Sequence, residues 1–345
     1  MKIKNTILLG FTPIIFLIIL AVIAAGSFLI FSQKSLLISK PKELYPITVR
    51  LKWLHQSQFA GNYVADQKGY YEDEGLKVTL LPFDYEHFPI EEVINGQADF
   101  GITGADELIT ARSQGKKVKA LAVIYQENPI VAYALESSGI KNPIDFIGKR
   151  IGMEQGVNVE AVIHAMLASQ GINYQKDIEE IRIDYDATPL IEGKVDIATG
   201  YITNEPIQAE EAGYKVNIIA PYKYGIKLYA DVLFTTEEMI ETKPEIIQGF
   251  VQATLKGWEY ALSHQDEAVK YTMLYEDPNN ISLNEPHQKA LLENSVPFIK
   301  PTAGSKIGEM NFSVWSSTYK VMKDFDAIEG ETDVRDVYTT QFLAN

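Results

Sequence analysis

The feature that most constrains the fold is a local pattern that occurs twice in the chain. The stretches "NGQADFGITG" (95–104) and "EGKVDIATGY" (192–201) each read as a helix ending in glycine, two further residues, an aspartate, an apolar strand, and then threonine and glycine. A second pair, "RLKWLHQSQFAG" and "KRIGMEQGVNVEA" (149–161), reads in both cases as a strand, a polar turn and a helix start. Such repetition predicts two lobes built on one plan, although a common turn could also recur by chance.

The soluble part of the chain interleaves strands and helices. From Ile47 the stretches "ITVRLKW", "FAGNYVADQKG" and "KVTLLPF" alternate an apolar strand, a helix and a strand. This alternation is typical of an α/β fold with largely parallel sheets. Gly69 and Gly75 are expected to stop the helix and turn the chain into the next strand. Towards the C-terminus, helical spacing predicts helices packed on a sheet, with Trp258 and Trp315 as core aromatics.

The N-terminal residues form an apolar run long enough to cross a membrane. From Ile7 to Phe31 there are 25 residues without a charge, and a helix of that length spans roughly 37 Å against a bilayer core of about 30 Å. Lys2 and Lys4 precede the run, so the remainder is expected outside the cytoplasm. A cleaved signal peptide is the alternative, because "AVIAAGS" contains small residues, but the apolar run continues beyond it and favours an uncleaved anchor.

These observations predict an order of segments along the chain. We expect the bulk of the chain on the outer face of the cytoplasmic membrane or in the periplasm. The expected segments are an anchor or signal (1–33), a tether (34–46), the first part of lobe 1 (47–130), lobe 2 (131–227), and a return to lobe 1 with C-terminal helices (228–345).

Composition excludes several classes of function. The chain has 46 acidic and 31 basic residues and a net charge of −15, without a basic stripe, so nucleic acid is not an expected partner. The absence of cysteine excludes disulfides, thiolate metal sites, a cysteine nucleophile and a lipid-anchored cysteine. No catalytic or phosphate-binding motif is present, and the five histidines lack metal-ligand spacing. The sequence therefore favours binding over catalysis, with neither metal nor cofactor.

The candidate binding residues lie where predicted strands end, because ligands of open α/β sheets settle there. The segments so placed are "WLHQSQF" (53–59), "FDY" (83–85), "TGADE" (103–107), "EQGVN" (154–158) and "GYITNEP" (200–206), with "YKYGIKLYADVLF" (222–234) added. From them we select Trp53, His55, Phe59, Asp84, Thr103, Gly104, Asp106, Glu107, Gly156, Asn158, Tyr201, Asn204, Glu205, Tyr224 and Asp231.

The selected segments share an inventory of aromatic, amide and carboxylate side chains, with Lys223 and Lys227 as their only cations. That inventory suits a flat, neutral or cationic ligand with hydrogen-bond donors, because a ring can stack on aromatics and carboxylates accept N–H groups. A sulfonate or nitrate would more naturally meet arginine, although backbone N–H groups at helix starts could hold one. Taken singly, Trp53 could be a core residue, and Asp106 or Glu107 a first-turn acid.

Several stretches together resemble a known family. "LKWLHQSQFAGNYVADQKGYYEDEGLKVTLLP", "VINGQADFGITGADELITARSQGKKVKALAVIYQ", "TNEPIQAEEAGYKVNII" and "YGIKLYADVLFTTEEMI" resemble the SsuA/THI5-like (NMT1) family, from about Ile47 to about Leu274. The resemblance implies the type II periplasmic-binding-protein fold: two hinged lobes, here a monomer, that close on a ligand and present it to an ABC permease. The branch with "NEP" and "YADVLFTT" is similar to binders of thiamin pyrimidine precursors.

The resemblance also implies which residues form the cleft. Trp53, Asn204 and Glu205 stand in matching motifs, and the cleft set extends to Tyr63, Tyr125, Tyr201 and Tyr229. The family includes a pyrimidine synthase whose lysine and histidine lie in the segment matching "FGITGADEL". Thr103 and Glu107 occupy those places here, and the synthase's cysteine motif is absent, which tells against an enzyme.

Three functions follow as hypotheses. The first is a solute-binding protein of an ABC importer for a small nitrogen heterocycle, most closely a thiamin-type aminopyrimidine. The second is a ligand-sensing module that signals to a membrane partner, which an uncleaved anchor would suit. The third is a binder of another ligand of the family, such as a riboflavin-like ring, a sulfonate or nitrate.

Overall fold

The computed structural model describes residues 43–84, 86–153, 158–183, 186–277, 280, 282–325 and 328–343, with the backbone alone at 158. The expected anchor or signal (1–33) and most of the tether lie outside the described residues. Within the described ranges, no helix is both long enough and apolar enough to cross a membrane.

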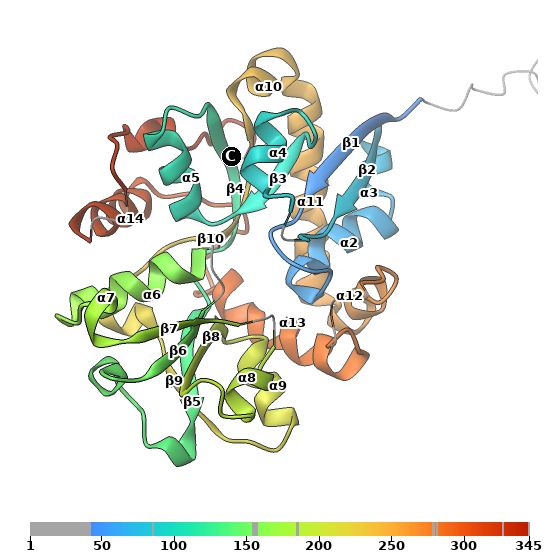
Figure 1. The fold of residues 1–345 in the computed structure, drawn as a ribbon. Coiled ribbons are helices and arrows are strands. Elements are labelled where there is room, and N and C mark those ends of the chain that lie inside the picture. The colour runs from blue at the N-terminus through green and yellow to red at the C-terminus, as the bar shows by residue number, and fades with distance from the viewer. Residues whose placement is uncertain are drawn as a thin grey trace, which may run out of the picture. The chain divides into compact units, whose positions relative to one another are not determined.

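Two five-stranded sheets organise residues 44–345, and we call each sheet with its covering helices a lobe (Figure 1). The first lobe has the strand order β2-β1-β3-β10-β4, and the second lobe has the order β7-β6-β8-β5-β9. The strands of the first lobe are β1 (Tyr45–Arg50), β2 (Leu76–Leu81), β3 (Phe100–Thr103), β4 (Val118–Tyr125) and β10 (Ala230–Thr236). Those of the second are β5 (Ile130–Leu135), β6 (Arg150–Met153), β7 (Glu179–Arg182), β8 (Ile197–Tyr201) and β9 (Val216–Ile219).

Both sheets are mixed, whereas the sequence predicted largely parallel ones. In the first lobe β10 runs antiparallel to β3 and β4, and in the second lobe β5 runs antiparallel to β8 and β9. The pairs β1–β2, β1–β3, β6–β7 and β6–β8 are parallel, as strands joined through helices should be. β5 and β10 are each the first strand after the chain crosses between lobes, so no helical crossover sets their direction.

The repeated sequence pattern corresponds to a repeated structural unit. Asp99 precedes β3 and accepts a hydrogen bond from the backbone N–H of Thr48 at 2.9 Å. Asp196 precedes β8 and accepts one from the backbone N–H of Arg150 at 3.0 Å. In each lobe this aspartate therefore joins the entry of one strand to the neighbouring parallel strand. The prediction that the two lobes share a plan is confirmed at these positions.

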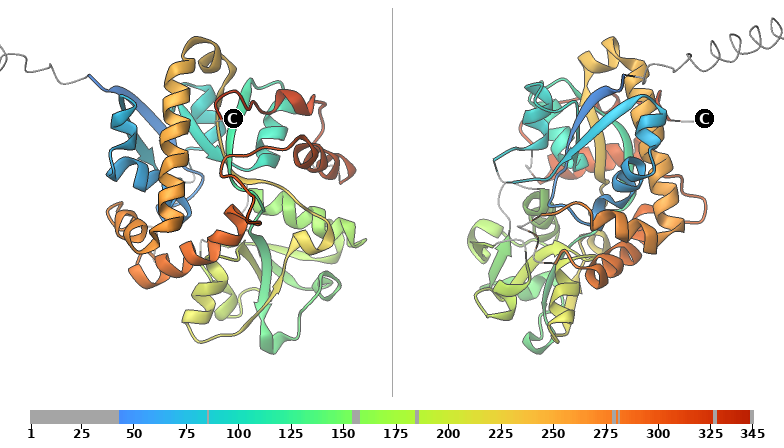
Figure 2. Two further views of the ribbon diagram at one scale, coloured as in Figure 1. Left: turned by 180° about the vertical axis from the view of Figure 1, so that it is seen from behind. Right: turned by 90° about the vertical axis from the view of Figure 1, so that its right-hand side faces the viewer.

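Helices cover both sheets, and the longest lies along the first lobe. Seen from behind, α11 runs down the first lobe and α13 extends towards the second (Figure 2). The helices are α2 (Ala60–Gln67), α3 (Tyr70–Asp73), α4 (Pro89–Ile94), α5 (Ala105–Ser113), α6 (Asn158–Ser169), α7 (Tyr174–Asp177), α8 (Thr188–Ile191), α9 (Glu205–Glu211), α10 (Glu237–Thr242), α11 (Pro244–Ser263), α12 (Gln265–Thr272), α13 (Glu285–Ile299) and α14 (Phe312–Asp324). Short 3-10 turns are η1 (Ser57–Phe59), η2 (Glu136–Ser138), η3 (Pro143–Phe146), η4 (Pro221–Tyr224) and η5 (Val334–Asp336).

The C-terminal helices supply much of the first lobe's core. Trp258 on α11 and Trp315 on α14 are fully buried, as predicted. Close contact between α11 and α2 depends on glycine, because a Cβ on Gly257 would lie 2.1 Å from the carbonyl oxygen of Gly61. The helix α10 ends at Thr242, and Lys243 precedes α11.

Candidate functional site

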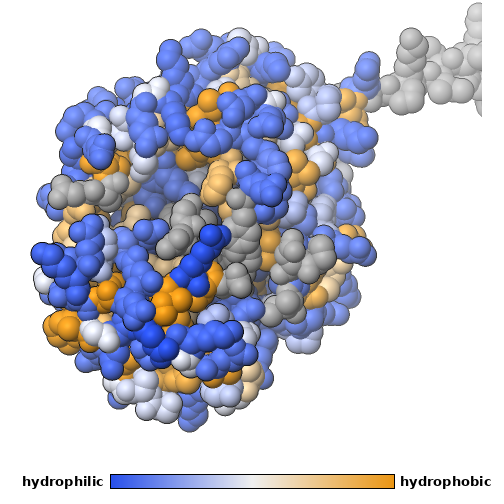
Figure 3. All heavy atoms as spheres, viewed as in Figure 1, coloured by the Kyte–Doolittle hydropathy of each residue, from blue (hydrophilic) through white to orange (hydrophobic). Residues whose placement is uncertain are grey.

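A cavity with about 570 Å³ of empty space, part of it open to solvent, lies between the two lobes, and we call it the interlobe cavity. In the space-filling view of this face, hydrophilic residues cover most of the surface and hydrophobic residues gather where the second lobe borders the first (Figure 3). The walls of the interlobe cavity come from the turns after β1 and β2, from η1, from the ends of β3 and β8, and from the starts of α4, α5, α6 and α9. It is lined by Lys52, Trp53, Gln56, Gln58, Phe83, Phe88, Pro89, Thr103, Glu107, Val159, Gly200, Tyr201, Asn204 and Glu205.

Aromatic side chains from both lobes line the interlobe cavity. Trp53, Phe83 and Phe88 come from the first lobe, and Tyr201 comes from the end of β8 in the second. Phe83 and Phe88 meet edge to face with ring centroids 5.4 Å apart. Flat, apolar walls of this kind favour a planar ligand, which buries both of its faces against rings.

Two carboxylates line the cavity, one from each lobe. Glu107, in the first turn of α5, accepts hydrogen bonds from the Gly104 backbone N–H at 2.8 Å and from the Thr103 hydroxyl at 2.5 Å. Glu205, the first residue of α9, accepts from the Tyr201 backbone N–H at 2.7 Å and from the Asn204 amide. Each carboxylate thus ties the turn after a parallel strand to the helix that follows, and these bonds fix its position in the cavity.

Burial changes the acidity of Glu205. Removal from water raises its pKa to about 7, while the Tyr201 backbone N–H and the Asn204 amide oppose that rise. Near neutral pH this side chain can therefore accept a hydrogen bond as a carboxylate or donate one as an acid. The glycine at position 200 makes room for it, because a Cβ there would lie 2.3 Å from Glu205 Oε2.

A buried cation connects the two lobes. Lys52 Nζ donates to the Tyr201 hydroxyl at 3.0 Å and lies 3.7 Å from Asp231 Oδ1. Tyr201 donates to Asp231 at 3.3 Å, and the Gln58 amide donates to the same carboxylate at 2.9 Å. Burial raises the pKa of Asp231, whereas the Lys52 charge lowers it.

The backbone at Asp231 is unusual. Its φ of 49° makes it the one non-glycine residue with positive φ among the described positions. Such a conformation is strained for an ordinary side chain and concentrates at functional sites. The strained residue is therefore the one whose buried carboxylate contacts side chains of both lobes, Gln58 in the first and Tyr201 in the second.

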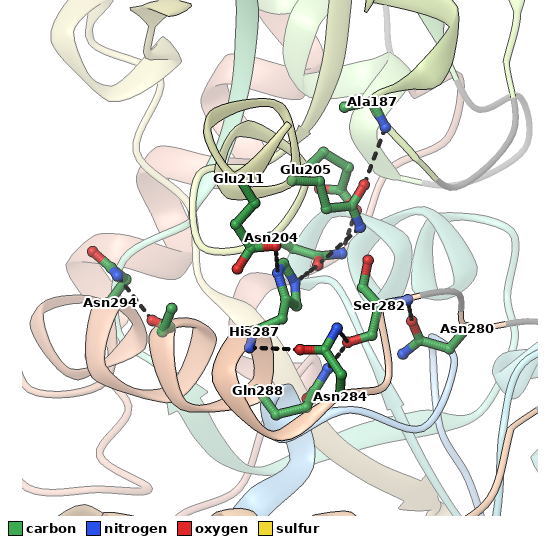
Figure 4. A network of polar contacts seen from close by, with 12 residues as sticks. Ala187, Asn204, Glu205, Glu211, Asn280, Ser282, Asn284, His287, Gln288 and Asn294 are labelled. Carbon is green, nitrogen blue, oxygen red and sulfur yellow. Dashed lines mark hydrogen bonds and ion pairs between the residues drawn. The ribbon is translucent and has the colours of Figure 1, made fainter. Parts of the chain in front are cut away.

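A histidine on α13 supports the second lobe's wall from outside the cavity (Figure 4). His287 is completely buried. Its Nε2 lies 2.8 Å from Asn204 Oδ1 and its Nδ1 lies 2.9 Å from Glu211 Oε2. The other end of the Asn204 amide donates to Glu205, so one chain of hydrogen bonds joins α13 to a carboxylate of the cavity.

The structure brings part of the predicted site set together. Trp53, Thr103, Glu107, Tyr201, Asn204 and Glu205 line the interlobe cavity. Asp231 does not line the cavity, but its carboxylate contacts three residues that do, Lys52, Gln58 and Tyr201. Gly104 contributes its backbone N–H, which donates to Glu107. Gly156 lies outside the described residues, and of Asn158 only the backbone is described.

Other predicted residues do not line this cavity. His55, Phe59 and Tyr63 are buried in the first lobe, where His55 Nδ1 lies 3.0 Å from the Tyr63 hydroxyl and burial lowers the His55 pKa to about 4. Tyr125 is buried and donates to Ser295. The remaining predicted residues also lie elsewhere. Asp84 is hydrogen-bonded to His87, and the Tyr229 hydroxyl accepts a hydrogen bond from the Asn311 backbone N–H. Tyr224 packs on the core of the second lobe, and Asp106 lines two other cavities.

Sequence reasoning missed several residues of the cavity. Lys52 is the most important, because Lys223 and Lys227 were the only cations expected and neither lines the cavity. Lys52 stands one residue before the selected turn, beside the aromatic cluster that could have drawn attention to it. Gln56 and Gln58 lie within that turn and also line the cavity. Two amide side chains between a strand and a helix could have indicated that this turn faces a ligand.

Comparison with known proteins decides the family. The model of the family described as NMT1/THI5 like matches residues 56–268. The chain belongs to this family. The match begins in the turn after β1 and covers β2 to β10, all of α11 and the first part of α12. It therefore includes every residue of the interlobe cavity except Lys52 and Trp53.

The named relatives of this chain include binding proteins and an enzyme. The riboflavin-binding protein RibY of Chloroflexus aurantiacus is 27% identical over 87% of this chain and 86% of its own. A 4-amino-5-hydroxymethyl-2-methylpyrimidine phosphate synthase of Legionella pneumophila is 25% identical over 86% of this chain and 92% of its own. The formylaminopyrimidine-binding protein of Halalkalibacterium halodurans is 25% identical over 71% of this chain and 75% of its own.

Solved structures establish the fold. The periplasmic aliphatic sulphonate-binding protein SsuA of Escherichia coli aligns with a TM-score of 0.64 over 87% of this chain and 94% of its own, at 16% identity. At that identity the likeness concerns the fold alone. The fold is therefore the α/β periplasmic-binding-protein fold with two sheets.

Proposed function

We propose that this NMT1/THI5-like protein is an extracytoplasmic solute-binding protein that captures a small nitrogen heterocycle between its lobes and delivers it to an ABC importer. The observation that carries the proposal is the interlobe cavity, in which aromatic rings from both lobes accompany one carboxylate from each. The fold and the binding proteins among its relatives support a solute-binding role.

The polar groups of the cavity suit a ring that carries both donors and acceptors. Glu107 and Glu205 can accept N–H groups of an amino-substituted ring. Lys52, Gln56 and Gln58 can donate to ring nitrogens or carbonyl oxygens. A planar heterocycle held on two edges in this way, and stacked on Trp53, gains orientation as well as affinity.

The ligand we place first is an aminopyrimidine of the thiamin precursor type. The name of the formylaminopyrimidine-binding relative supports this class, and so does the cavity's supply of acceptors for amino groups. Riboflavin is the second candidate, because the riboflavin-binding relative matches over most of the chain. Both ligands are planar nitrogen heterocycles, and the same aromatic walls can serve either one.

We propose binding without catalysis. The chain has no cysteine, and Thr103 and Glu107 occupy the positions at which the pyrimidine synthase of the family has a lysine and a histidine. Because one relative is named as a pyrimidine phosphate synthase, the proposal needs a direct check. Incubation with pyridoxal phosphate should yield no pyrimidine product by mass spectrometry, and a product would contradict it.

Location outside the cytoplasm is part of the proposal. The uncharged run from Ile7 to Phe31, preceded by Lys2 and Lys4, supports export with retention at the membrane. Fractionation of cells expressing the protein tests this, since the full-length chain should remain with membranes after high-salt washing. Release of a shortened chain would show cleavage of the N-terminal run instead.

A thermal-shift screen tests the ligand class. The protein is first unfolded and refolded to remove any ligand carried through purification. Aminopyrimidines, thiamin, riboflavin, alkanesulfonates, taurine and nitrate are then compared at equal concentration. We expect a rise in melting temperature with a heterocycle, since binding to the folded state alone stabilises it. Shifts with sulfonates or nitrate only would overturn the proposed ligand class.

A further inference from the structure

A second cavity adjoins the interlobe cavity and has a different character. It holds about 930 Å³ of empty space, part of it open to solvent, and we call it the side cavity. The two cavities share Phe88, Pro89, Thr103 and Glu107 as lining residues, so they meet along one wall. A ligand seated on the aromatic walls of the first can therefore extend into the second.

The lining of the side cavity is polar along one helix. Asp106 and Thr110 on α5 and Gln114, the C-cap residue of that helix, follow one another at spacings of four residues, which places them on the same face. Ala161 of α6 and Met322 of α14 also line the cavity. The side cavity thus offers a row of hydrogen-bonding groups, whereas the interlobe cavity offers rings.

Asp106 is the least satisfied polar group in this row. The residue is only 3% exposed, and among the described residues no donor bonds to its Oδ1 atom. Burial raises its pKa to about 7; the neighbouring Glu107 adds to the rise and Lys52 opposes it. A buried oxygen without a donor destabilises a protein by about 1–3 kcal/mol, so its retention needs an explanation beyond folding.

The charges around the side cavity define what it can accept. Its one lysine, Lys116, forms an ion pair with Glu91 at 2.5 Å. The remaining charged groups of the lining are the carboxyls of Asp106 and Glu107. A phosphate or sulfonate would meet like charge here, whereas hydroxyl and amino groups would find acceptors.

We infer that the side cavity binds a hydroxyl- or amine-bearing chain attached to the heterocycle, with a donor of that chain completing the hydrogen bonds of Asp106. The inference rests on the proposed function, since it assumes a ring in the interlobe cavity. It makes the natural ligand a two-part molecule: a flat ring for the aromatic walls and a donor-rich arm for α5. Asp106 and Thr110 then determine specificity for the arm, and Trp53 and Glu205 for the ring.

Paired probes test the inference in the full-length protein. Isothermal titration compares riboflavin with lumiflavin, which has the same ring system and a methyl group in place of the polyol chain. A second pair is an aminopyrimidine with and without an aminomethyl arm. In the ring class that binds, we expect the arm to tighten binding by about tenfold or more, as about 1.4 kcal/mol of added interaction would give.

Variants locate the arm. Asp106→Asn should remove most of the advantage of the arm-bearing probe and leave the affinity for the ring-only probe unchanged. Thr110→Val, which is isosteric and only partly buried, should act in the same direction and serves if Asp106→Asn does not fold. Asp266→Asn, on an exposed carboxylate of α12, is the matched control and should change neither affinity.

The outcomes separate this inference from the proposed function. Equal affinities for ring-only and arm-bearing probes would overturn the inference while the proposed function stands. An arm that tightens binding equally in the wild type and in both α5 variants would also overturn it, because the arm would lie elsewhere. Failure of every heterocycle to bind would overturn the proposed function and the inference together.

Discussion

At the scale of single residues, Glu205 links the cavity to pH. Its pKa is raised from 4.5 to about 7, so the folded protein keeps a proton that the unfolded chain releases between those values. The free energy of unfolding should therefore fall as pH rises from about 4.5 to 7. Glu205→Gln cannot ionise, and the variant should show a shallower fall than the wild type across this window.

Urea unfolding at a series of pH values measures the effect of Glu205→Gln. Glu210→Gln is the matched control, because Glu210 is an exposed glutamate on the same helix, α9. The control should keep the slope of the wild type. A Glu205→Gln variant with that same slope would show that Glu205 titrates in the folded protein as it does in water.

At the scale of elements, the contact of α11 with α2 depends on Gly257. An added Cβ would lie 2.1 Å from the backbone oxygen of Gly61 and 2.8 Å from the Cβ of Ala65, and backbone cannot move aside cheaply. Gly257→Ala should lower the free energy of unfolding by about 1–3 kcal/mol, as overpacking does. Gly304→Ala, where a Cβ meets nothing within 4 Å, should stay within about 0.5 kcal/mol of the wild type. Equal denaturation midpoints for the two variants would contradict this account.

The helix α13 connects the first lobe to the cavity wall through His287. His287→Ala removes the shorter of two contacts to Asn204 Oδ1 and leaves only the Gln208 amide at 3.4 Å, so the amide that holds Glu205 is held less firmly. We expect a loss of about 1–3 kcal/mol in stability, together with weaker ligand binding in titration calorimetry. His264→Ala, on an exposed histidine, should change neither quantity. A His287→Ala variant that loses stability but binds normally would reduce His287 to a packing role.

The sequence predicted the helices and strands better than it predicted which side chains face the cavity and which face the core. Trp53 and Glu205 line the cavity because they follow the ends of parallel strands, Trp53 in the turn after β1 and Glu205 at the start of α9, which is a local signal. Phe59 and Tyr63 were expected with them, but helical periodicity on η1 and α2 turns both into the first lobe's core. An aromatic near a turn does not reveal by itself which face it occupies.

Long-range contacts account for the residues that the sequence did not reveal. Lys52 is buried because Asp231, far along the chain, returns on β10 to meet it. His287 belongs to a C-terminal helix that sequence reasoning assigned to packing alone, yet its ring contacts Asn204 across the fold. Local periodicity contains no information on such pairs, even for Lys52, which lies in a stretch that resembles the family.

At the scale of the whole molecule, we expect ligand-dependent closure of the two lobes. The Lys52–Tyr201 and Tyr201–Asp231 hydrogen bonds join the lobes directly beside the interlobe cavity. A ligand contacting Glu107 and Glu205 would add contacts between the lobes and favour the closed arrangement. Small-angle X-ray scattering should show a smaller radius of gyration with a bound heterocycle. The Glu205→Gln variant, which loses one lobe's carboxylate, should require more ligand for the same change.

A calorimetric titration of ligand-stripped protein, with the heterocycle that gives the largest thermal shift, tests directly whether the interlobe cavity binds the ring. We expect micromolar or tighter binding by the wild type and a loss of about tenfold or more in Trp53→Ala, since stacking and burial of the ring are removed together. Tyr214→Ala, on an exposed aromatic of the second lobe, should bind like the wild type. Heterocycle binding that is indifferent to Trp53→Ala and to Glu205→Gln would place the ligand outside the interlobe cavity and contradict the account.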